Sequence, residues 1–574
     1  MNRKENKKDY ITSVIIIILY IAGLIFIGCF HEPWFDEAQA WLIAKSASYK
    51  EIITVVPHYE GHPPLWHLLL SVFAKNGASF DIALKSINIT FCTIAMSLIV
   101  FRSPFPKIVR YGLPFTYFFF YQYGVYCRPY SMIMAEFMLI AILYKERDSK
   151  PWRYILALAL LCMSHAYGIM VAGGLCLAWT VEIIVELYNG GKLASFYKDK
   201  RFYSLCFILA VAVIIITMIF PAEDCFYPGV EDNKSFMEVF TDYGKYILLL
   251  IMPFESWSGV IIGLYGLKSI VPVVIVEIAI GLLSWVFLIM VTKKNKKLLT
   301  FFLPYIIMTG FMTFKYMSVH HIGLSAVFHV FIFWIMTEQE GGIRVPEFLV
   351  KIKDSFSSPL IRNVIYGAGV LICLMPVVYS IGASYMDING ECGTSEFGRV
   401  IKANHLEDKK IMAEWHIDYE TVSADGIVDM NAFKVLEIPS EHEKIKGNKT
   451  FLMFDPVMIL PYFDRNIFMN FNADCSDDLY MHYKYEDTEE TFEKWRKKGL
   501  PDFIISYCPI DEIYDEKILD GVKYLAVHLV ECNIFYKLDS NTYFERMYMR
   551  EDLFEDYPQF KWIDDQRGNV YERK

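Results

Sequence analysis

Two adjacent carboxylates, Asp36 and Glu37, follow closely on the first apolar run of the chain, in the stretch WFDEAQAWLIAK (Trp34 to Lys45). A charged side chain beside a membrane segment is costly unless it has a partner or a task. A carboxylate within hydrogen-bond reach of a hydroxyl can remove its proton and act as a general base. The same pair could instead serve the helix that this stretch predicts, because carboxylates in a first turn interact favourably with the helix dipole.

A second group of polar side chains lies in the stretch HYEGHPPLW, which carries His58, Glu60 and His62. Histidine and glutamate are metal ligands, but H-x-E-x-H before a Pro-Pro break matches no known zinc spacing. A divalent metal therefore stays an open alternative, and no cofactor is predicted. We expect His62 and its neighbours to shape a polar corner where the chain turns into the next helix.

Cationic and aromatic residues at later turns complete the candidate site. They are Arg128 and Tyr130 in YCRPYS, His165 in SHAYG, and the adjacent His320 and His321 in SVHHIG. Taken singly, the arginine could contact lipid headgroups, and each histidine could cap a helix or line an interface. A carboxylate pair facing several cations indicates an acid/base centre beside an anion site, which is what transfer from a phosphate-bearing donor requires.

The composition places these residues in a polytopic α-helical membrane protein. Of the 574 residues, 55% are hydrophobic and only 21% are charged, an apolar content above that of an ordinary soluble domain. Short basic clusters separate the apolar runs. The positive-inside rule assigns these clusters to the cytoplasmic side, together with the amino terminus before an uncleaved first helix.

Parity between the basic clusters predicts about eleven crossings, with the carboxyl terminus outside. The predicted crossings are 11–30, 82–101, 111–127, 130–144, 154–165, 168–187, two between 202 and 291, 299–316, 322–336 and 364–380. The stretch 63–74 is too short to span, so we expect it to lie along the outer interface. The stretch 243–267, interrupted by PFESW, is expected to be re-entrant or interfacial.

The chain divides into two parts of different character. Residues 1–383 form the predicted transmembrane domain, with a large first outer loop at 31–81, and carry 26 acidic and 32 basic side chains. Residues 384–574 carry 39 acidic and 23 basic side chains, and short β-type runs (FLMFD, NIFMNF, DFIISY, NIFYKL) alternate there with helical stretches such as ETFEKWRKKG. This pattern predicts an extracytoplasmic α/β domain. Its acidity argues against nucleic acid as a partner.

The order of these motifs resembles the GT-C superfamily of membrane glycosyltransferases. An Asp-Glu pair in the first outer loop, the downstream GHPPLW, the R-P-Y-S turn and an outer carboxyl-terminal α/β domain are similar to two of its families. These are the dolichyl-phosphate-mannose protein mannosyltransferases and the bacterial aminoarabinose transferases of lipid A. The chain departs from the longer family pattern, which often reads REARPY, where it has VYCRPY.

The resemblance implies an inverting transfer of a sugar from a polyprenyl-phosphate donor to an acceptor hydroxyl of a protein, lipid or envelope glycan, at the outer face of the membrane. It implies that Asp36 is the general base and that Glu37 is its companion. The residues implied near the donor phosphate are His62, Arg128, His320 and His321. We expect Glu60, His58, Tyr130 and His165 to support them.

Other function classes remain compatible with the sequence. A transporter or lipid flippase would use outer-face charges too, but is expected to show paired halves and polar residues at mid-membrane depth. A different polysaccharide polymerase or ligase would carry its key loop late in the chain. A non-catalytic protein that binds envelope polysaccharide would tolerate loss of Asp36. The Lys- and Ile-rich composition favours a bacterial cell membrane.

Overall fold

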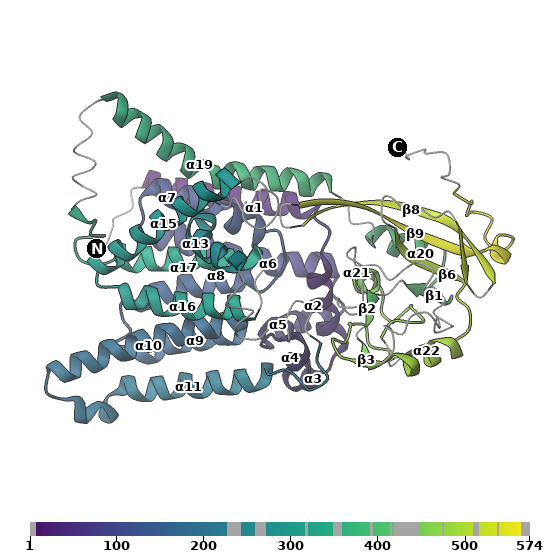
Figure 1. Ribbon diagram of the computed structural model, residues 1–574, viewed down its shortest axis with the longest axis horizontal. Coiled ribbons are helices and arrows are strands. Elements are labelled where there is room, and N and C mark those ends of the chain that lie inside the picture. The colour runs from purple at the N-terminus through teal and green to yellow at the C-terminus, as the bar shows by residue number, and fades with distance from the viewer. Residues whose placement is uncertain are drawn as a thin grey trace.

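The computed structural model describes residues 7–226, 243–258, 271–315, 319–347, 359–390, 394–413, 416–417, 448–449, 451–472, 476–508, 516–519, 521–536 and 539–563. Within these residues the protein is mostly helical, with a mixed sheet near the carboxyl terminus (Figure 1). The long helices run side by side in a bundle. The sheet lies beyond one end of that bundle, so the two predicted kinds of structure occupy separate regions.

The long helices of the bundle come from all of the predicted transmembrane part. They are α1 (Lys7–Gly28), α6 (Phe80–Ser97), α8 (Tyr130–Tyr144), α9 (Pro151–Ser164), α10 (Ala166–Asn189), α11 (Lys200–Ile219), α13 (Tyr243–Ser258), α15 (Val271–Lys294), α16 (Leu298–Phe314), α17 (Val319–Thr337) and α19 (Pro359–Asn389). Within the described residues, five helices are long and apolar enough to cross a membrane: Lys7–Gly28, Phe80–Arg102, Ala166–Asn189, Lys200–Ile219 and His320–Thr337. Several of them expose large apolar side chains, such as Leu209 of α11, as a lipid-facing surface requires. The chain is therefore a multi-pass membrane protein.

The crossing predicted at 111–127 is wrong as a continuous helix. This stretch holds the end of α7 (Lys107–Gly112), a 3₁₀ turn at Leu113–Phe115 and a π turn at Phe118–Gln122. Pro114 lacks a backbone N–H and interrupts the helical hydrogen-bond ladder. At Gly124 the chain turns so tightly that an added Cβ would lie 2.0 Å from the carbonyl oxygen of Phe120. The stretch is short, irregular and buried within the bundle.

Helix α13 corrects a second expectation. It packs against α15 and α17, and the ring of Trp257 stacks on that of His329, in the middle of α17, with the centroids 5.8 Å apart. This part of 243–267 therefore belongs to the bundle and does not lie along its surface, which contradicts the interfacial alternative. Residues 259–267 lie outside the described residues.

The carboxyl-terminal part contains a five-stranded sheet in the order β1-β6-β9-β8-β7. Strand β1 (Ile411–Ala413) runs parallel to β6 (Phe503–Cys508), and the other neighbours are antiparallel: β7 (Glu516–Leu519), β8 (Val522–Tyr536) and β9 (Asp539–Arg550). Two small pairs join β2 (His416–Ile417) to β4 (Phe451–Leu452) and β3 (Asn448–Lys449) to β5 (Glu486–Asp487). The helices here are α20 (Thr394–Ala403), α21 (Phe454–Ile459) and α22 (Thr488–Lys497).

Two of the predicted β-type runs are not regular strands. FLMFD forms only the short β4 before α21 begins, where Asp455 and Pro456 occupy the first helical turn, positions that suit both residue types. NIFMNF makes one isolated bridge, from Phe468 to Ile411. Helix α19 continues to Asn389, past the predicted domain boundary after residue 383.

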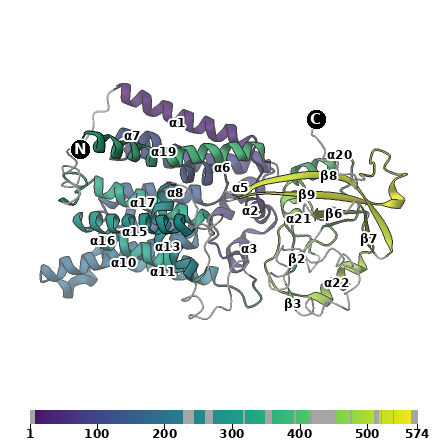
Figure 2. The same ribbon diagram turned by 45° about the horizontal axis from the view of Figure 1, so that its top comes forward.

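The first loop lies between the bundle and this carboxyl-terminal domain (Figures 1 and 2). It contains α2 (Phe35–Ser46), α3 (Tyr49–Thr54), α4 (Val56–Glu60) and α5 (Leu65–Ala74). The apolar side of α2 shares a hydrophobic cluster with α21, and the rings of Phe35 and Phe454 are 5.0 Å apart. Lys45 Nζ also donates to the carbonyl of Phe463 (2.6 Å). The loop and the domain are thus packed as one unit.

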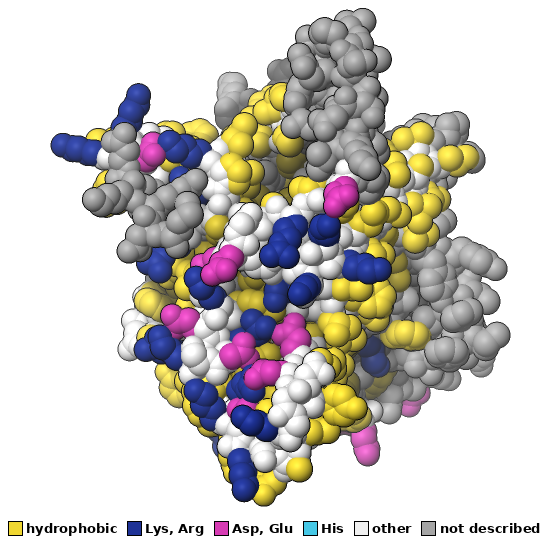
Figure 3. Space-filling view, turned by 90° about the vertical axis from the view of Figure 1, so that its left-hand side faces the viewer, with side chains coloured by type: hydrophobic (Ala, Val, Ile, Leu, Met, Phe, Trp, Pro, Cys, Tyr) yellow, Lys and Arg dark blue, Asp and Glu magenta, His cyan; other side chains and the backbone are white. Residues whose placement is uncertain are grey.

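The opposite end of the bundle is rich in lysine and arginine (Figure 3). The carboxyl ends of α8, α10 and α15 and the amino ends of α9, α11 and α16 meet there. These ends and the turns that join them carry exposed lysines at 145, 150, 192, 198, 200, 293 and 294. The predicted site residues lie at the other end. The bundle therefore separates a basic surface from the polar turns that face the carboxyl-terminal domain.

Candidate functional site

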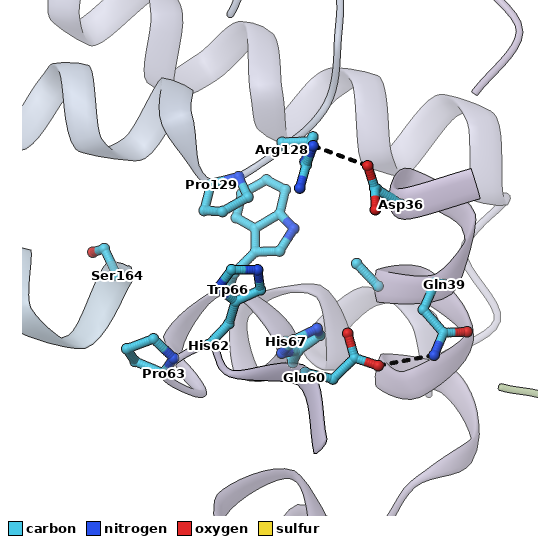
Figure 4. Close-up of a pocket in the computed structure, with 11 residues that line it drawn as sticks. Asp36, Gln39, Glu60, His62, Pro63, Trp66, His67, Arg128, Pro129 and Ser164 are labelled. Atoms are coloured by element: carbon cyan, nitrogen blue, oxygen red, sulfur yellow. Dashed lines mark hydrogen bonds and ion pairs between the residues drawn. The ribbon is translucent and has the colours of Figure 1, made fainter. Parts of the chain in front are cut away.

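A pocket opens between the first loop and the turn that precedes α8 (Figure 4). Its cavity volume is about 50 Å³, several times the roughly 10–15 Å³ that one water needs. The lining residues are Asp36, Gln39, Ala40, Glu60, His62, Pro63, Trp66, His67, Arg128, Pro129 and Ser164. Asp36 and Arg128 lie at one end, Ser164 lies at the other, and His62 and Trp66 lie between them.

Asp36 faces Arg128 across one end of the pocket. The Asp36 Oδ2 and Arg128 Nη1 atoms are 2.9 Å apart, and about a third of the Asp36 side chain remains exposed. Asp36 is in the first turn of α2, and Arg128 comes just before α8, so two segments distant in sequence supply the pair. The guanidinium also lies over the ring of Tyr130 and within 3.4 Å of His320 Nε2. This end of the pocket offers a reachable carboxylate beside a held cation.

Glu60 places a second carboxylate on the pocket wall. Its Oε1 accepts a hydrogen bond from Gln39 Nε2 (2.9 Å). Burial, with a smaller contribution from the charge of Asp36, raises the pKa of Glu60 to about 7, although Gln39 and Arg128 act in the opposite direction. A carboxyl group of this pKa can take up or release a proton at neutral pH, which is the property of an effective general acid or base.

The predicted histidines converge next to these carboxylates. The rings of His62 and His165 are 4.6 Å apart, those of His320 and His321 are 4.2 Å apart, and Tyr130 lies 5.3 Å from His165 and 5.4 Å from His320. Burial, helped by the positive charge of Arg128, lowers the pKa of His62 to about 4. His62 is therefore neutral at pH 7. It contributes hydrogen bonds, and Arg128 contributes the charge.

Several buried nitrogen atoms around the pocket have no hydrogen-bond partner among the described residues. These atoms are His62 Nδ1, Trp66 Nε1 and His67 Nδ1, which belong to lining residues, and His165 Nε2 behind them. An unsatisfied buried polar atom costs roughly 1–3 kcal/mol. Indole offers a donor only, and a neutral imidazole offers one donor and one acceptor. The pocket is consequently prepared for a ligand that carries both acceptors and donors.

Glu37 does not line the pocket, although the sequence pairs it with Asp36 as a catalytic candidate. It is fully buried, accepts hydrogen bonds from the backbone N–H groups of Trp34 (2.8 Å) and Cys127 (2.6 Å), and pairs with His31 (3.3 Å). His31 in turn pairs with Asp387 at the end of α19 (3.1 Å). Glu37 is therefore an anchor that ties the start of α2 to three other segments.

His58 also lies away from the pocket. Its Nδ1–H donates to the carbonyl of Phe220, after α11, at 2.6 Å. Among the described residues, no three histidine, cysteine or carboxylate side chains are placed to hold a metal ion. The H-x-E-x-H run accordingly splits: Glu60 and His62 reach the pocket, while His58 fastens the loop to α11.

Sequence reasoning missed several residues of this region. Gln39, Trp66 and Ser164 line the pocket, and His31 and Asp387 build the anchor around Glu37. Glutamine, tryptophan and serine at single positions give no sequence signal for a site. His31 was detectable, because it lies at the mouth of the first helix six residues before Glu37.

Comparisons with protein-family models, with curated proteins and with solved structures find no match for this chain. The case for a function therefore depends on the residues and geometry of the pocket.

Proposed function

We propose that the protein is an inverting membrane glycosyltransferase, which moves a sugar from a polyprenyl-phosphate donor to an acceptor hydroxyl of a protein, lipid or envelope glycan. The observation that carries this proposal is the Asp36–Arg128 pair in a pocket lined by unsatisfied nitrogen atoms. The combination of a base and a fixed cation is what such a transfer needs. We also propose that the protein is a GT-C type enzyme, on the resemblance of its motifs.

The proposed step is a single displacement at the anomeric carbon. Asp36 takes the proton of the acceptor hydroxyl while its oxygen forms the new glycosidic bond. The bond between the anomeric carbon and the phosphate oxygen breaks, and the polyprenyl phosphate leaves with the electron pair. Arg128 stabilises the phosphate charge, in a site where partial exclusion of water strengthens the interaction. The attack from the opposite face inverts the anomeric centre.

The remaining residues take supporting roles in this proposal. His320 contacts the Arg128 guanidinium, and His165 and His321 pack near the ring of Tyr130, over which that guanidinium lies. In this proposal they hold the cation in place. His62, which is neutral, and Trp66 offer hydrogen bonds to the sugar or the phosphate. Glu37 contributes by holding α2, and thereby Asp36, in place.

The membrane context supports the same proposal. A polyprenyl chain is insoluble in water and needs apolar helices beside the site, which the bundle supplies. The basic end of the bundle fits the cytoplasmic side by the positive-inside rule. We therefore propose that the pocket and the carboxyl-terminal domain face the outside of a bacterial cell membrane, with the amino terminus in the cytoplasm.

The experiment that tests the proposal is sugar transfer in reconstituted membranes from a panel of labelled polyprenyl-phosphate sugars. Asp36→Asn removes the base at nearly constant shape, and we expect it to lower transfer, or slow hydrolysis of the donor, at least about a hundredfold. Asp9→Asn is the matched control, because Asp9 forms a comparable ion pair with Lys107 (2.6 Å) outside the pocket. Equal loss in both variants, or turnover of a donor that survives Asp36→Asn, contradicts the proposal.

A further inference from the structure

Helix α2 lies between the pocket and the carboxyl-terminal domain, and one side chain touches both. Asp36 and Ala40 face the pocket, whereas Phe35 packs on Phe454 and the Ser46 hydroxyl accepts a hydrogen bond from Leu479 N–H (3.3 Å). Gln39 belongs to both sides. It lines the pocket, yet it is also bonded to the carboxyl-terminal domain.

The amide of Gln39 is fixed by a backbone group of that domain. Its Oε1 accepts from Met481 N–H (3.0 Å), and its Nε2 donates to the Met481 carbonyl (2.8 Å). Because Met481 offers one donor and one acceptor, only one orientation of the amide satisfies both bonds. The second N–H of Nε2 then points to Glu60 Oε1 (2.9 Å). Docking of the domain therefore decides what Gln39 presents to the pocket.

The hydrogen bond from Gln39 acts on the ionisation of Glu60 together with several charges around it. Asp36 faces it from α2, Arg128 faces it from the turn before α8, and His62 and His67 lie on the same pocket. Asp36 opposes ionisation of Glu60, while Arg128 favours it. The bond from Gln39 favours the ionised form as well. Loss of the hydrogen bond from Gln39 should therefore raise the pKa of Glu60 and lower the ionised fraction of this carboxylate at neutral pH.

We propose that Gln39 is a positioning residue through which the carboxyl-terminal domain controls Glu60, and that Glu60 is a second proton-accepting group of the pocket, which accepts a proton more readily at neutral pH when the domain is docked. The part concerning proton acceptance rests on the proposed sugar transfer. The link from the domain through Gln39 to Glu60 does not rest on it. The domain thus acts as part of the site, although it places no side chain among the residues lining the described pocket.

The link is tested by infrared difference spectroscopy on the full-length protein in membranes, from about pH 5 to about pH 9. Glu60→Gln identifies the carboxylic acid band of Glu60, which we expect to titrate near neutral pH. Gln39→Met, of similar shape but without the amide, is expected to move that titration to higher pH by about one unit. Gln39→Asn, whose amide is too short to bridge Met481 and Glu60, is expected to move it in the same direction. Both variants are first checked for native unfolding behaviour.

Ser46→Ala is the matched control, because it removes another hydrogen bond between α2 and the domain without touching Glu60. We expect no shift in this variant. A Glu60 titration that is unchanged in both Gln39 variants, or that moves equally in Ser46→Ala, overturns the link.

Transfer activity separates the two proposals. In the pH profile of transfer, we expect the acidic side to shift together with the titration of the Glu60 band. A titration that shifts while the pH profile of transfer stays the same overturns the role of Glu60 in proton acceptance. A band that moves while no donor is turned over overturns the proposed function and leaves the link standing.

Discussion

Asp36 and Glu37 are neighbours in the first turn of α2, yet they occupy opposite kinds of surroundings. Successive helical residues point about 100° apart, so one carboxylate faces the pocket and the other faces the packed junction of α1, α2 and α19. Glu37 is fully buried and held by two backbone N–H groups and by His31. Asp36 is a third exposed and faces Arg128 among unsatisfied nitrogens. The same residue class therefore serves structure at one position and, in our proposal, chemistry at the next.

The charges of the anchor, formed by Glu37, His31 and Asp387, compensate one another. Burial alone would lower the pKa of His31, but the charges of Asp387 and Glu37 outweigh that effect and raise it to about 10. Burial opposes ionisation of Glu37 too, but His31 and the two backbone donors hold its pKa below the usual value. His31 is therefore a cation between two anions at neutral pH. Such a network leaves no group for a ligand.

The largest effect should come from breaking the anchor. Glu37→Gln removes one partner of a buried ion pair and leaves His31 less compensated, and we expect it to destabilise the protein by about 3–5 kcal/mol. Asp36→Asn, one residue earlier, should change stability by less than about 1 kcal/mol, because its ion pair is partly exposed. Denaturant unfolding in detergent measures both. Similar stability losses in the two variants would erase the contrast between the two carboxylates.

A second way to test the anchor is its pH dependence. The folded pKa of His31 lies above its ordinary value of 6.5, so its contribution to stability is complete below about pH 6.5 and is lost as the pH rises towards about 10. Asp387→Asn removes one of the two carboxylates and so lowers the folded pKa of His31, and in that variant the loss should be smaller and should be complete at a lower pH. Unfolding midpoints measured along a pH series check this. A parallel pH dependence in the native chain and in Asp387→Asn would contradict the charge on His31.

The sequence predicts the elements better than their orientation. Apolar runs and basic clusters locate most of the long helices, and the polar turns at 36, 60–62, 128, 165 and 320–321 meet at the same end of the bundle. The irregular backbone at 111–127 was not predicted, because its aromatic residues give the same apolar pattern as a membrane helix. The breaks in the helix come from Pro114 and Gly124. Residue types alone could not separate Asp36 from Glu37, because the packing of α2 sets which face meets the pocket. Gln39 could not be found, since its partner Met481 lies far along the chain.

The smallest expected effect concerns the pocket, at Trp66. Trp66 is almost fully buried, and its Nε1 has no partner among the described residues. Trp66→Phe keeps an aromatic ring and removes this unsatisfied donor, so the free protein should be as stable as the native chain or more stable by about 1 kcal/mol. If the pocket binds phosphate and sugar groups, the same variant should bind polyprenyl monophosphate sugars more weakly, by several-fold.

A thermal-shift titration with these donors measures both quantities on one sample. We expect the unliganded midpoint of Trp66→Phe to be equal or higher and its ligand-induced shift to be smaller than that of the native chain. Trp41→Phe is the control, because Trp41 is also buried in the first loop and belongs to the same hydrophobic cluster as Trp66, but it does not line the pocket. A lower unliganded midpoint with an unchanged shift would mean that Trp66 serves packing, as Trp41 does. In a binding surface, an indole N–H lowers the stability of the free protein and forms its hydrogen bond only when the sugar donor is bound. In an anchor, every polar group already has its partner in the free protein.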